Sequence, residues 1–354
     1  MNMLNHRLVI KFLWMVPLLL ATLACNAAAQ LINPNSSIPF SPTPLPSTNE
    51  LPTLSTSTTA SSEACTSLLP EILRSATSHD DHDRASTSSG DEQEIHYLIV
   101  YSLDADGLGA REDIIVPADI EPELDSRTSH EYIWNYFTSL IPAEERIFVT
   151  EFAILTDGKD NILAGVSPTY QDPTQWTLKV DVVDAGDPYS LSYTLLHEFG
   201  HFLTLKPDQV PPDSNVFYNP HDEVIYQQAL ATCPRYFTGE GCSNSGSYIN
   251  EFFNRYWSGL YTEWEQINDV RGQESYRNQL NDFYSKYQDQ FLTQYASTSP
   301  EEDIAEAWTF FVLSPKPEPT SMANLKVLFF YDYPELVALR EQIRSRLCSS
   351  FPHP

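Results

Sequence analysis

Four apolar stretches between residues 95 and 183 predict β-strands. The last of them shows the clearest pattern, because Trp176, Leu178, Val180 and Val182 alternate with polar residues and share one face of an extended chain. The predicted strands cover Ile95–Leu103, Ile147–Leu155, Ile162–Val166 and Trp176–Val183. We interpret Asp157-Gly158 and Asp104-Ala105-Asp106-Gly107 as turns. The second could also begin a calcium-binding loop, but the further ligands and the closing Glu of such a loop are missing.

A helical period replaces the alternation at residues 187–205. Asp187 is suited to cap a helix, Pro188 to occupy its first position and Pro207 to end it. Two histidines, His197 and His201, lie on one face of this helix. The opposite arc is apolar and consists of Leu191, Leu195, Leu196, Phe199, Phe202 and Leu203. The pattern predicts a helix that buries one face and presents two imidazoles on the other.

Helical patterns dominate the rest of the chain. We interpret the aromatic residues of its second half as helix–helix core. The predicted helices cover Arg127–Leu140, Ser247–Val270, Gln273–Tyr295, a segment that follows Ser299-Pro300, and Pro334–Leu347, with one strand-like stretch at Leu325–Tyr331. Together these elements predict an α+β fold. A small, mostly antiparallel sheet packs on the helix of the two histidines, and a largely helical C-terminal half follows.

The N-terminus has the pattern of an export signal. His6, Arg7 and Lys11 precede a short apolar run, Phe12–Ala24, which suits a signal peptide better than a membrane span. The next segment, Thr22-Leu23-Ala24-Cys25, is similar to a bacterial lipoprotein box, although Thr22 stands where Leu is usual. We therefore expect a signal peptide over residues 1–25 and a lipid on Cys25, which would anchor the protein on the outer face of the membrane. Cleavage after Ala29, giving a secreted protein, is the alternative.

Residues 26–93 are rich in Pro, Ser and Thr and predict an extended tether with one short amphipathic arm, Cys65–Ala76. The tether contains His79-Asp80-Asp81-His82-Asp83, which we interpret as a solvated loop because nothing fixes a metal-binding geometry there. The folded body is expected over residues 94–354. With 20 basic and 48 acidic residues, the chain has a formal charge of −28, which argues against nucleic acid as a partner.

Five cysteines fit an exported protein. If Cys25 carries lipid, an even set of four remains, which suggests disulfides and allows three connectivities. A bond between Cys233 and Cys242 would close a short loop, and a bond between Cys65 and Cys348 would join the arm to the C-terminus. Other pairings and free thiols stay open. The absence of a CxxC motif argues against a zinc ribbon.

The segment His197-Glu198-Phe199-Gly200-His201 carries the chemistry. Two histidines four residues apart on a helix can hold one zinc ion from one side. The carboxylate of Glu198 lies between them and can act as general base toward a water molecule activated by the metal. Zinc needs a third protein ligand. The metzincin position is occupied by Pro207, and His221 lies in an acidic loop.

The best third ligand lies in Ser299-Pro300-Glu301-Glu302-Asp303-Ile304-Ala305-Glu306. Its Ser-Pro start predicts a helix on which Glu302 and Glu306 share one face. Glu302 would bind zinc, and Glu306, one turn later, would orient a histidine ligand. Glu302 could instead serve only in a capping box, and Glu251 is the rival ligand.

The HExxH motif, followed by Glu-x-x-x-Glu on a later helix, resembles the gluzincins. Within them the chain is similar to the catalytic domain of anthrax lethal factor and to the Pro-Pro endopeptidases, which carry a catalytic Tyr seven residues before the ligand Glu. Tyr295 stands seven residues before Glu302. The resemblance implies a zincin-like fold, zinc on His197, His201 and Glu302, and Tyr295 as a donor to the oxyanion. A role as an ordinary helix-end aromatic is the alternative for Tyr295.

These residues predict an exported zinc endopeptidase that hydrolyses a peptide or protein substrate, with Glu198 as general base. A catalytically inactive, zincin-fold surface binding lipoprotein is the alternative. The intact Glu198 argues against it. A zinc hydrolase that acts on a non-peptide amide is a third class, for which no residue pattern gives support.

Overall fold

The structure is a computed structural model that describes residues 67–75, 96–104, 106–114, 122–156, 162–268 and 273–352. The signal peptide at 1–25, Cys25, most of the tether, the His79–Asp83 cluster and the Asp157-Gly158 turn lie outside these residues, so those predictions stay predictions. Within the described part of the chain, no helix combines the length and apolar character needed to cross a membrane.

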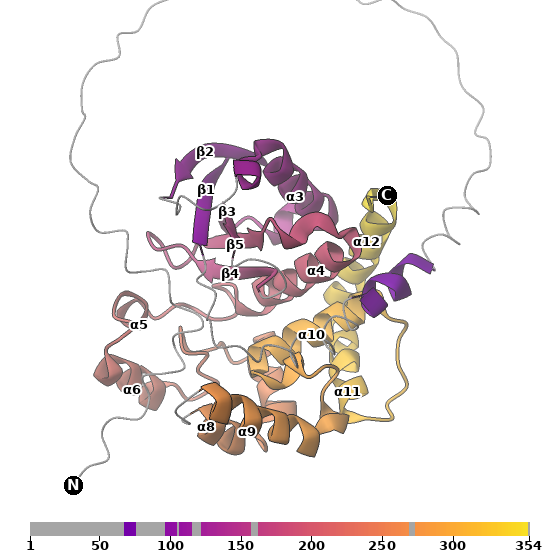
Figure 1. The fold of residues 1–354 in the computed structure, drawn as a ribbon. Helices are drawn as coiled ribbons and strands as arrows, with labels where there is room; N and C mark the ends of the chain where they lie inside the picture. Colours follow the sequence, from indigo (N-terminus) through magenta and orange to yellow (C-terminus); the bar gives the residue numbers. More distant parts are fainter. Residues whose placement is uncertain are drawn as a thin grey trace, which may run out of the picture.

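A five-stranded sheet forms one layer of the molecule, in the order β2-β1-β3-β5-β4 (Figure 1). β3 and β5 pair in parallel and the other neighbours pair antiparallel, so the sheet is mixed. The sequence did not predict β2, because this edge strand is mostly polar and exposed. The strands are β1 (His96–Asp104), β2 (Gly107–Asp113), β3 (Val149–Thr156), β4 (Ala164–Pro168) and β5 (Trp176–Asp181).

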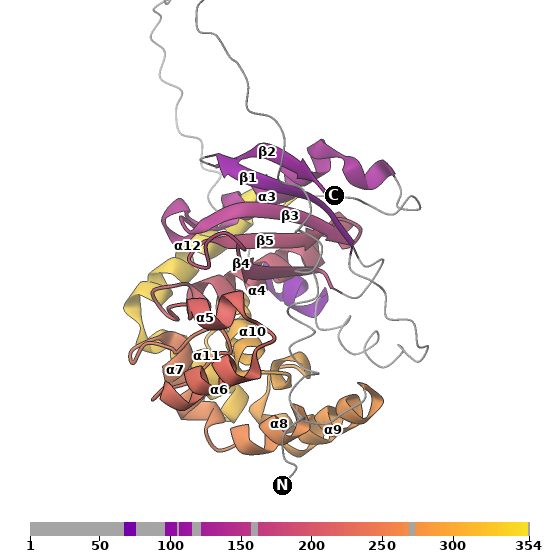
Figure 2. The same ribbon diagram turned by 90° about the vertical axis from the view of Figure 1, so that its left-hand side faces the viewer.

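Two helices, α3 (Arg127–Leu140) and α4 (Pro188–Leu205), pack on the sheet through aromatic side chains. Phe202 of α4 lies with its ring 5.9 Å from that of Trp176 and 6.3 Å from that of Phe137 in α3. Trp134 of α3 contacts Phe152 of β3 in the same way, at 5.5 Å. The apolar arc predicted for α4 therefore belongs to the core between helix and sheet. α4 lies next to β4 and β5 (Figure 2).

The second half of the chain is helical, as predicted, but two of its predicted helices are shorter than expected, and the last one extends to Ser350 instead of Leu347. The segment predicted as one helix at Ser247–Val270 is broken by a π-helical turn at Phe253–Trp257. The helix predicted to reach Tyr295 ends at Lys286. The helices are α5 (Ser214–Tyr218), α6 (Glu223–Thr232), α7 (Tyr248–Phe252), α8 (Tyr261–Asn268), α9 (Gln273–Lys286), α10 (Pro300–Leu313), α11 (Met322–Phe329) and α12 (Pro334–Ser350).

The strand predicted at Leu325–Tyr331 was wrong, because this segment is α11 followed by a 3-10 turn at Phe330–Asp332. Ser321 caps α11 by accepting the Asn324 N–H. The buried Lys326 ammonium of α11 pairs with the Asp303 carboxylate of α10 at 2.5 Å. A short apolar run is compatible with either a strand or a helix. Here the Ser321 cap and the ion pair between Lys326 and Asp303 stabilise the helix.

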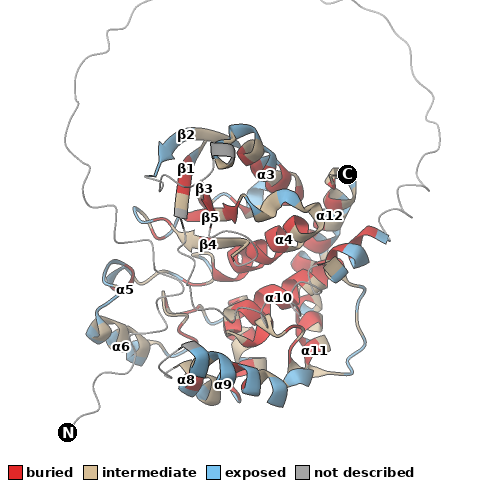
Figure 3. Cartoon of the chain, in the orientation of Figure 1, coloured by how far each residue is buried: buried red, intermediate tan, exposed pale blue. Residues whose placement is uncertain are grey.

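Burial is concentrated in α4 and α10, which lie side by side at the centre of the molecule (Figure 3). Residues 67–75 also form a helix, and they add Leu69 and Ile72 to the core. The Ser75 hydroxyl reaches the Asp187 carboxylate at the start of α4, at 3.5 Å. The amphipathic arm predicted at Cys65–Ala76 is therefore part of the folded body over its described residues.

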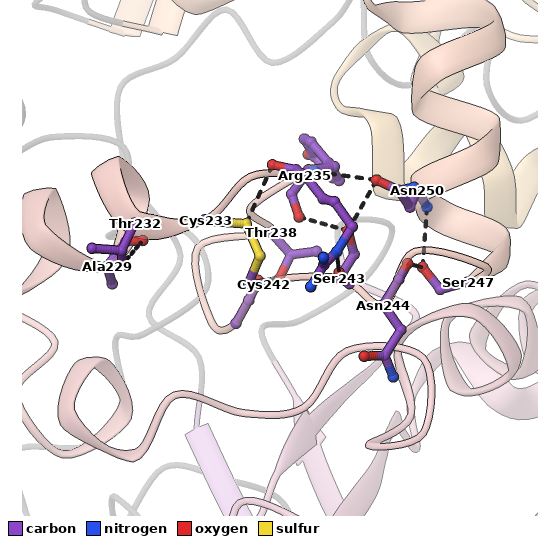
Figure 4. Close-up of a disulfide and its surroundings, with 12 residues drawn as sticks. Ala229, Thr232, Cys233, Arg235, Thr238, Cys242, Ser243, Asn244, Ser247 and Asn250 are labelled. Atoms are coloured by element: carbon purple, nitrogen blue, oxygen red, sulfur yellow. Dashed lines mark hydrogen bonds between the residues drawn. A yellow bond between two sulfur atoms is a disulfide. The ribbon is translucent and has the colours of Figure 1, made fainter.

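The predicted bond between Cys233 and Cys242 is present (Figure 4). It closes a loop that Arg235 also holds by donating to the Ser243 carbonyl. Cys348 is disulfide-bonded as well. Its predicted partner Cys65 lies outside the described residues, so that pairing stays a prediction. These bonds are compatible with an exported protein.

Candidate metal centre

The two helices that carry the candidate ligands begin in the same way. Asp187 caps α4 by accepting the N–H groups of Tyr189 at 3.2 Å and Ser190 at 3.1 Å. Ser299 caps α10 by accepting the Glu302 N–H at 3.1 Å. A proline occupies the first turn of each helix. The predicted helix starts are confirmed. Ser299 satisfies the Glu302 N–H, whereas the Glu302 carboxylate, which a capping box would direct back to the start of the helix, lies at the two histidines.

A close crossing at Gly200 brings the two helices together. A Cβ added there would lie 3.0 Å from Ala305 Cα and 3.2 Å from Trp308 Cδ1. A side chain at position 200 would therefore hold α10 away from α4. Since Gly200 stands between the two histidines and Ala305 stands one turn after Glu302, this contact sets how far the carboxylate lies from the imidazoles.

At this crossing three buried side chains converge as the sequence predicts. His197 Nε2 lies 3.1 Å from His201 Nε2 and 3.0 Å from Glu302 Oε2. His201 Nε2 lies 3.3 Å from the same Glu302 oxygen. A tetrahedral zinc with bonds of about 2.0–2.1 Å requires ligand atoms about 3.3 Å apart. The His197–His201–Glu302 group could therefore hold a metal ion.

Glu306 determines which nitrogen of His197 faces this group. His197 Nδ1 lies 2.9 Å from Glu306 Oε1. A carboxylate only accepts, so the proton of this bond is on Nδ1, and with a metal bound Nε2 would present its lone pair to the ion. In metal sites a histidine ligand commonly donates its second ring N–H to a carboxylate, which fixes the orientation of the imidazole. The bond between His197 and Glu306 fits this pattern. Glu306 is 1 % exposed.

Glu198 and Tyr295, the two candidate catalytic side chains, also lie at this centre. Glu198 is 6 % exposed, and burial raises the pKa of its carboxyl, with the neighbouring His201 and His197 acting in the opposite direction. The ring of Tyr295 lies 5.7 Å from that of His197. The 3-10 turn Tyr295–Ser297 places it there, immediately before α10.

The rival ligands lie elsewhere. The Glu251 carboxylate pairs with Arg255 at 3.1 Å and accepts the Tyr333 hydroxyl at 2.9 Å. His221 is exposed in the loop before α6. Neither belongs to the group that could hold a metal.

Two residues of the site were missed from the sequence, and both contact Glu306. The Tyr193 hydroxyl lies 2.8 Å from Glu306 Oε2, and the Thr293 hydroxyl lies 2.7 Å from the same oxygen. Tyr193 precedes His197 by four residues, so a helical wheel places it on the histidine face. No sequence signal singles out Thr293, which lies outside any α-helix.

Further ionisable groups lie around the centre. Burial and the charge of Glu301 raise the pKa of Glu240 to about 7. Burial lowers the pKa of Lys179 on β5 to about 8, although Glu240 and Glu198 oppose that shift. The Tyr236 hydroxyl donates to the Glu301 carboxylate at 2.7 Å.

Comparison of the chain with protein-family models, with curated proteins and with solved structures gives no match.

Proposed function

We propose that the protein is an exported zinc endopeptidase with a zincin-like fold, related in design to the gluzincins that its motifs resemble. The observation that carries the proposal is the convergence of His197, His201 and Glu302 at a spacing suited to tetrahedral zinc, with Glu198 beside them. When bound, zinc would polarise a substrate carbonyl and lower the pKa of water.

The protein's own residues supply the remaining steps. Glu198 accepts the proton of the attacking water and later donates it to the leaving amine. Tyr295 donates a hydrogen bond to the oxygen that becomes negative. Glu306, through its bond to Nδ1, would hold His197 in the orientation in which Nε2 can bind zinc. The substrate class is a peptide or protein, and anchoring through a lipid on Cys25 belongs to the same proposal.

The test is zinc content together with hydrolysis. Purified wild-type protein should contain about one zinc per chain and cleave members of a diverse peptide library. Glu198→Gln should keep the zinc and lose hydrolysis, because the amide cannot accept the proton. Glu302→Ala should lose most of the zinc. Glu251→Ala is the matched control and should keep it, since Glu251 pairs with Arg255 instead.

The outcomes separate the alternatives. An active Glu198→Gln variant would remove Glu198 as the base. Zinc without hydrolysis in the wild type would favour a binding protein on an inactive zincin scaffold, and hydrolysis of non-peptide amides alone would change the substrate class. A wild-type protein without zinc would overturn the proposal.

A further inference from the structure

The Thr293 hydroxyl bonds to two parts of the centre: the Glu306 carboxylate, which contacts His197, and the turn that contains Tyr295. It donates to Glu306 Oε2 at 2.7 Å, and it accepts the Ala296 N–H at 3.1 Å. The assignment follows from chemistry, because a carboxylate cannot donate and an amide N–H cannot accept. One hydroxyl therefore donates a hydrogen bond to Glu306 and accepts one from the turn that contains Tyr295. Thr293 is 7 % exposed, so water competes little for either bond.

The first bond fixes the Glu306 carboxylate. A glutamate has a flexible side chain, and its two oxygens here are held by different donors. Oε1 accepts from His197, Oε2 accepts from Thr293, and the Tyr193 hydroxyl lies 2.9 and 2.8 Å from the two oxygens. These donors prevent the carboxylate from rotating away from His197. The orientation of a metal-facing imidazole thus depends on a hydroxyl that does not touch it.

The second bond fixes the turn Tyr295–Ser297. Ala296 is the middle residue of this 3-10 turn, and its N–H is held by the Thr293 hydroxyl. The Tyr295 ring lies 5.7 Å from the His197 ring. A shift of the turn would therefore move the phenol relative to the metal centre.

We infer that Thr293 is a positioning residue that sets the geometry of the metal ligand His197, through Glu306, and that of Tyr295, through the turn at Ala296. The inference rests on the proposed function, since it assigns the residue a task in that site. It predicts that the loss of one hydroxyl affects both metal affinity and the chemical step.

The test compares Thr293→Val, which keeps the shape and removes the hydroxyl, with Thr293→Ser, which keeps the hydroxyl. The zinc Kd is measured by competition with a chromophoric chelator, and kcat is measured at saturating zinc. Thr293→Val should bind zinc about 10–100-fold more weakly, and kcat should also fall. Thr293→Ser should recover both values. Thr309→Val is the matched control, because Thr309 on α10 is also buried but its hydroxyl donates to the Ala305 carbonyl.

Tyr193→Phe separates the two effects and covers the case that Thr293→Val fails to fold. It removes a hydroxyl from Glu306 but leaves the bond between Thr293 and Ala296 in place, so zinc affinity should fall while kcat at saturating zinc should fall less than in Thr293→Val. Zinc binding by Thr293→Val as tight as that of wild type would overturn the inference, and so would failure of Thr293→Ser to recover affinity. A wild-type protein without zinc would instead overturn the proposed function itself.

Discussion

Replacing Gly200 by alanine tests the crossing that builds the centre. The new Cβ would lie 3.0 Å from Ala305 Cα, whereas ordinary contacts begin at 3.4 Å, so α4 and α10 must separate by about 0.4 Å. If Glu302 moves with α10, its distance to His201 grows from 3.3 Å to about 3.7 Å, beyond the roughly 3.3 Å that tetrahedral zinc requires, while its distance to His197 grows from 3.0 Å to about 3.4 Å and stays compatible with zinc. The pair of ligands that loses its spacing is therefore Glu302 and His201. We expect zinc affinity to fall about tenfold, which corresponds to about 1.4 kcal/mol.

Protein stability should change less than zinc affinity. Overpacking costs about 1–3 kcal/mol, and replacing a helical glycine by alanine returns about 1 kcal/mol, which leaves a net loss of about 0–2 kcal/mol in the metal-free protein. Zinc Kd from chelator competition and urea unfolding measure the two quantities. Gly186→Ala is the control, since a Cβ at Gly186 meets nothing within 4 Å. Unchanged zinc affinity in Gly200→Ala would refute the reasoning that this contact sets the ligand spacing.

Two further predictions concern buried charges near the centre. Lys326→Met should lower the free energy of unfolding by about 3–5 kcal/mol, because it leaves the fully buried Asp303 carboxylate without its ion-pair partner. The exposed Lys316 provides the control, and an equal loss in Lys316→Met would contradict the assignment. Burial and the charge of Glu301 raise the pKa of Glu240 to about 7 in the folded protein, so the stability that its proton contributes is complete below about pH 4.5 and is lost as the pH rises through about 7. In metal-free protein, Glu240→Gln should therefore raise the free energy of unfolding by about 1–3 kcal/mol at pH 8 and change it little at pH 4, as measured by urea denaturation. A gain of the same size at both pH values would show that the titration of Glu240 is not its source.

Features with a local physical cause could be predicted from the sequence. The start of α4 follows from Asp187 and Pro188, and the start of α10 from Ser299 and Pro300, because caps act within one helical turn. The alternation predicted the strand β5 and the burial of Trp176, Leu178 and Val180, but not that Thr177 and Asp181 on the other face are buried too. Where the local signal was weak the prediction failed. The polar edge strand β2 was missed, and the apolar segment at 325–331 was assigned to a strand instead of α11.

The sequence by itself determined the chemistry of the centre: two imidazoles on one helical face, a carboxylate between them, and a second helix with two carboxylates on one face. It left the third ligand open between Glu302 and Glu251, because sequence spacing does not report distances between helices. Only the tertiary structure shows that Glu302, and not Glu251, lies with the two histidines. The crossing at Gly200 places Glu302 at the histidines, the pairing of Arg255 holds Glu251 elsewhere, and chain folding brings Thr293 to Glu306. Caps and periodicity act through neighbouring residues, whereas ligand spacing depends on packing between distant segments.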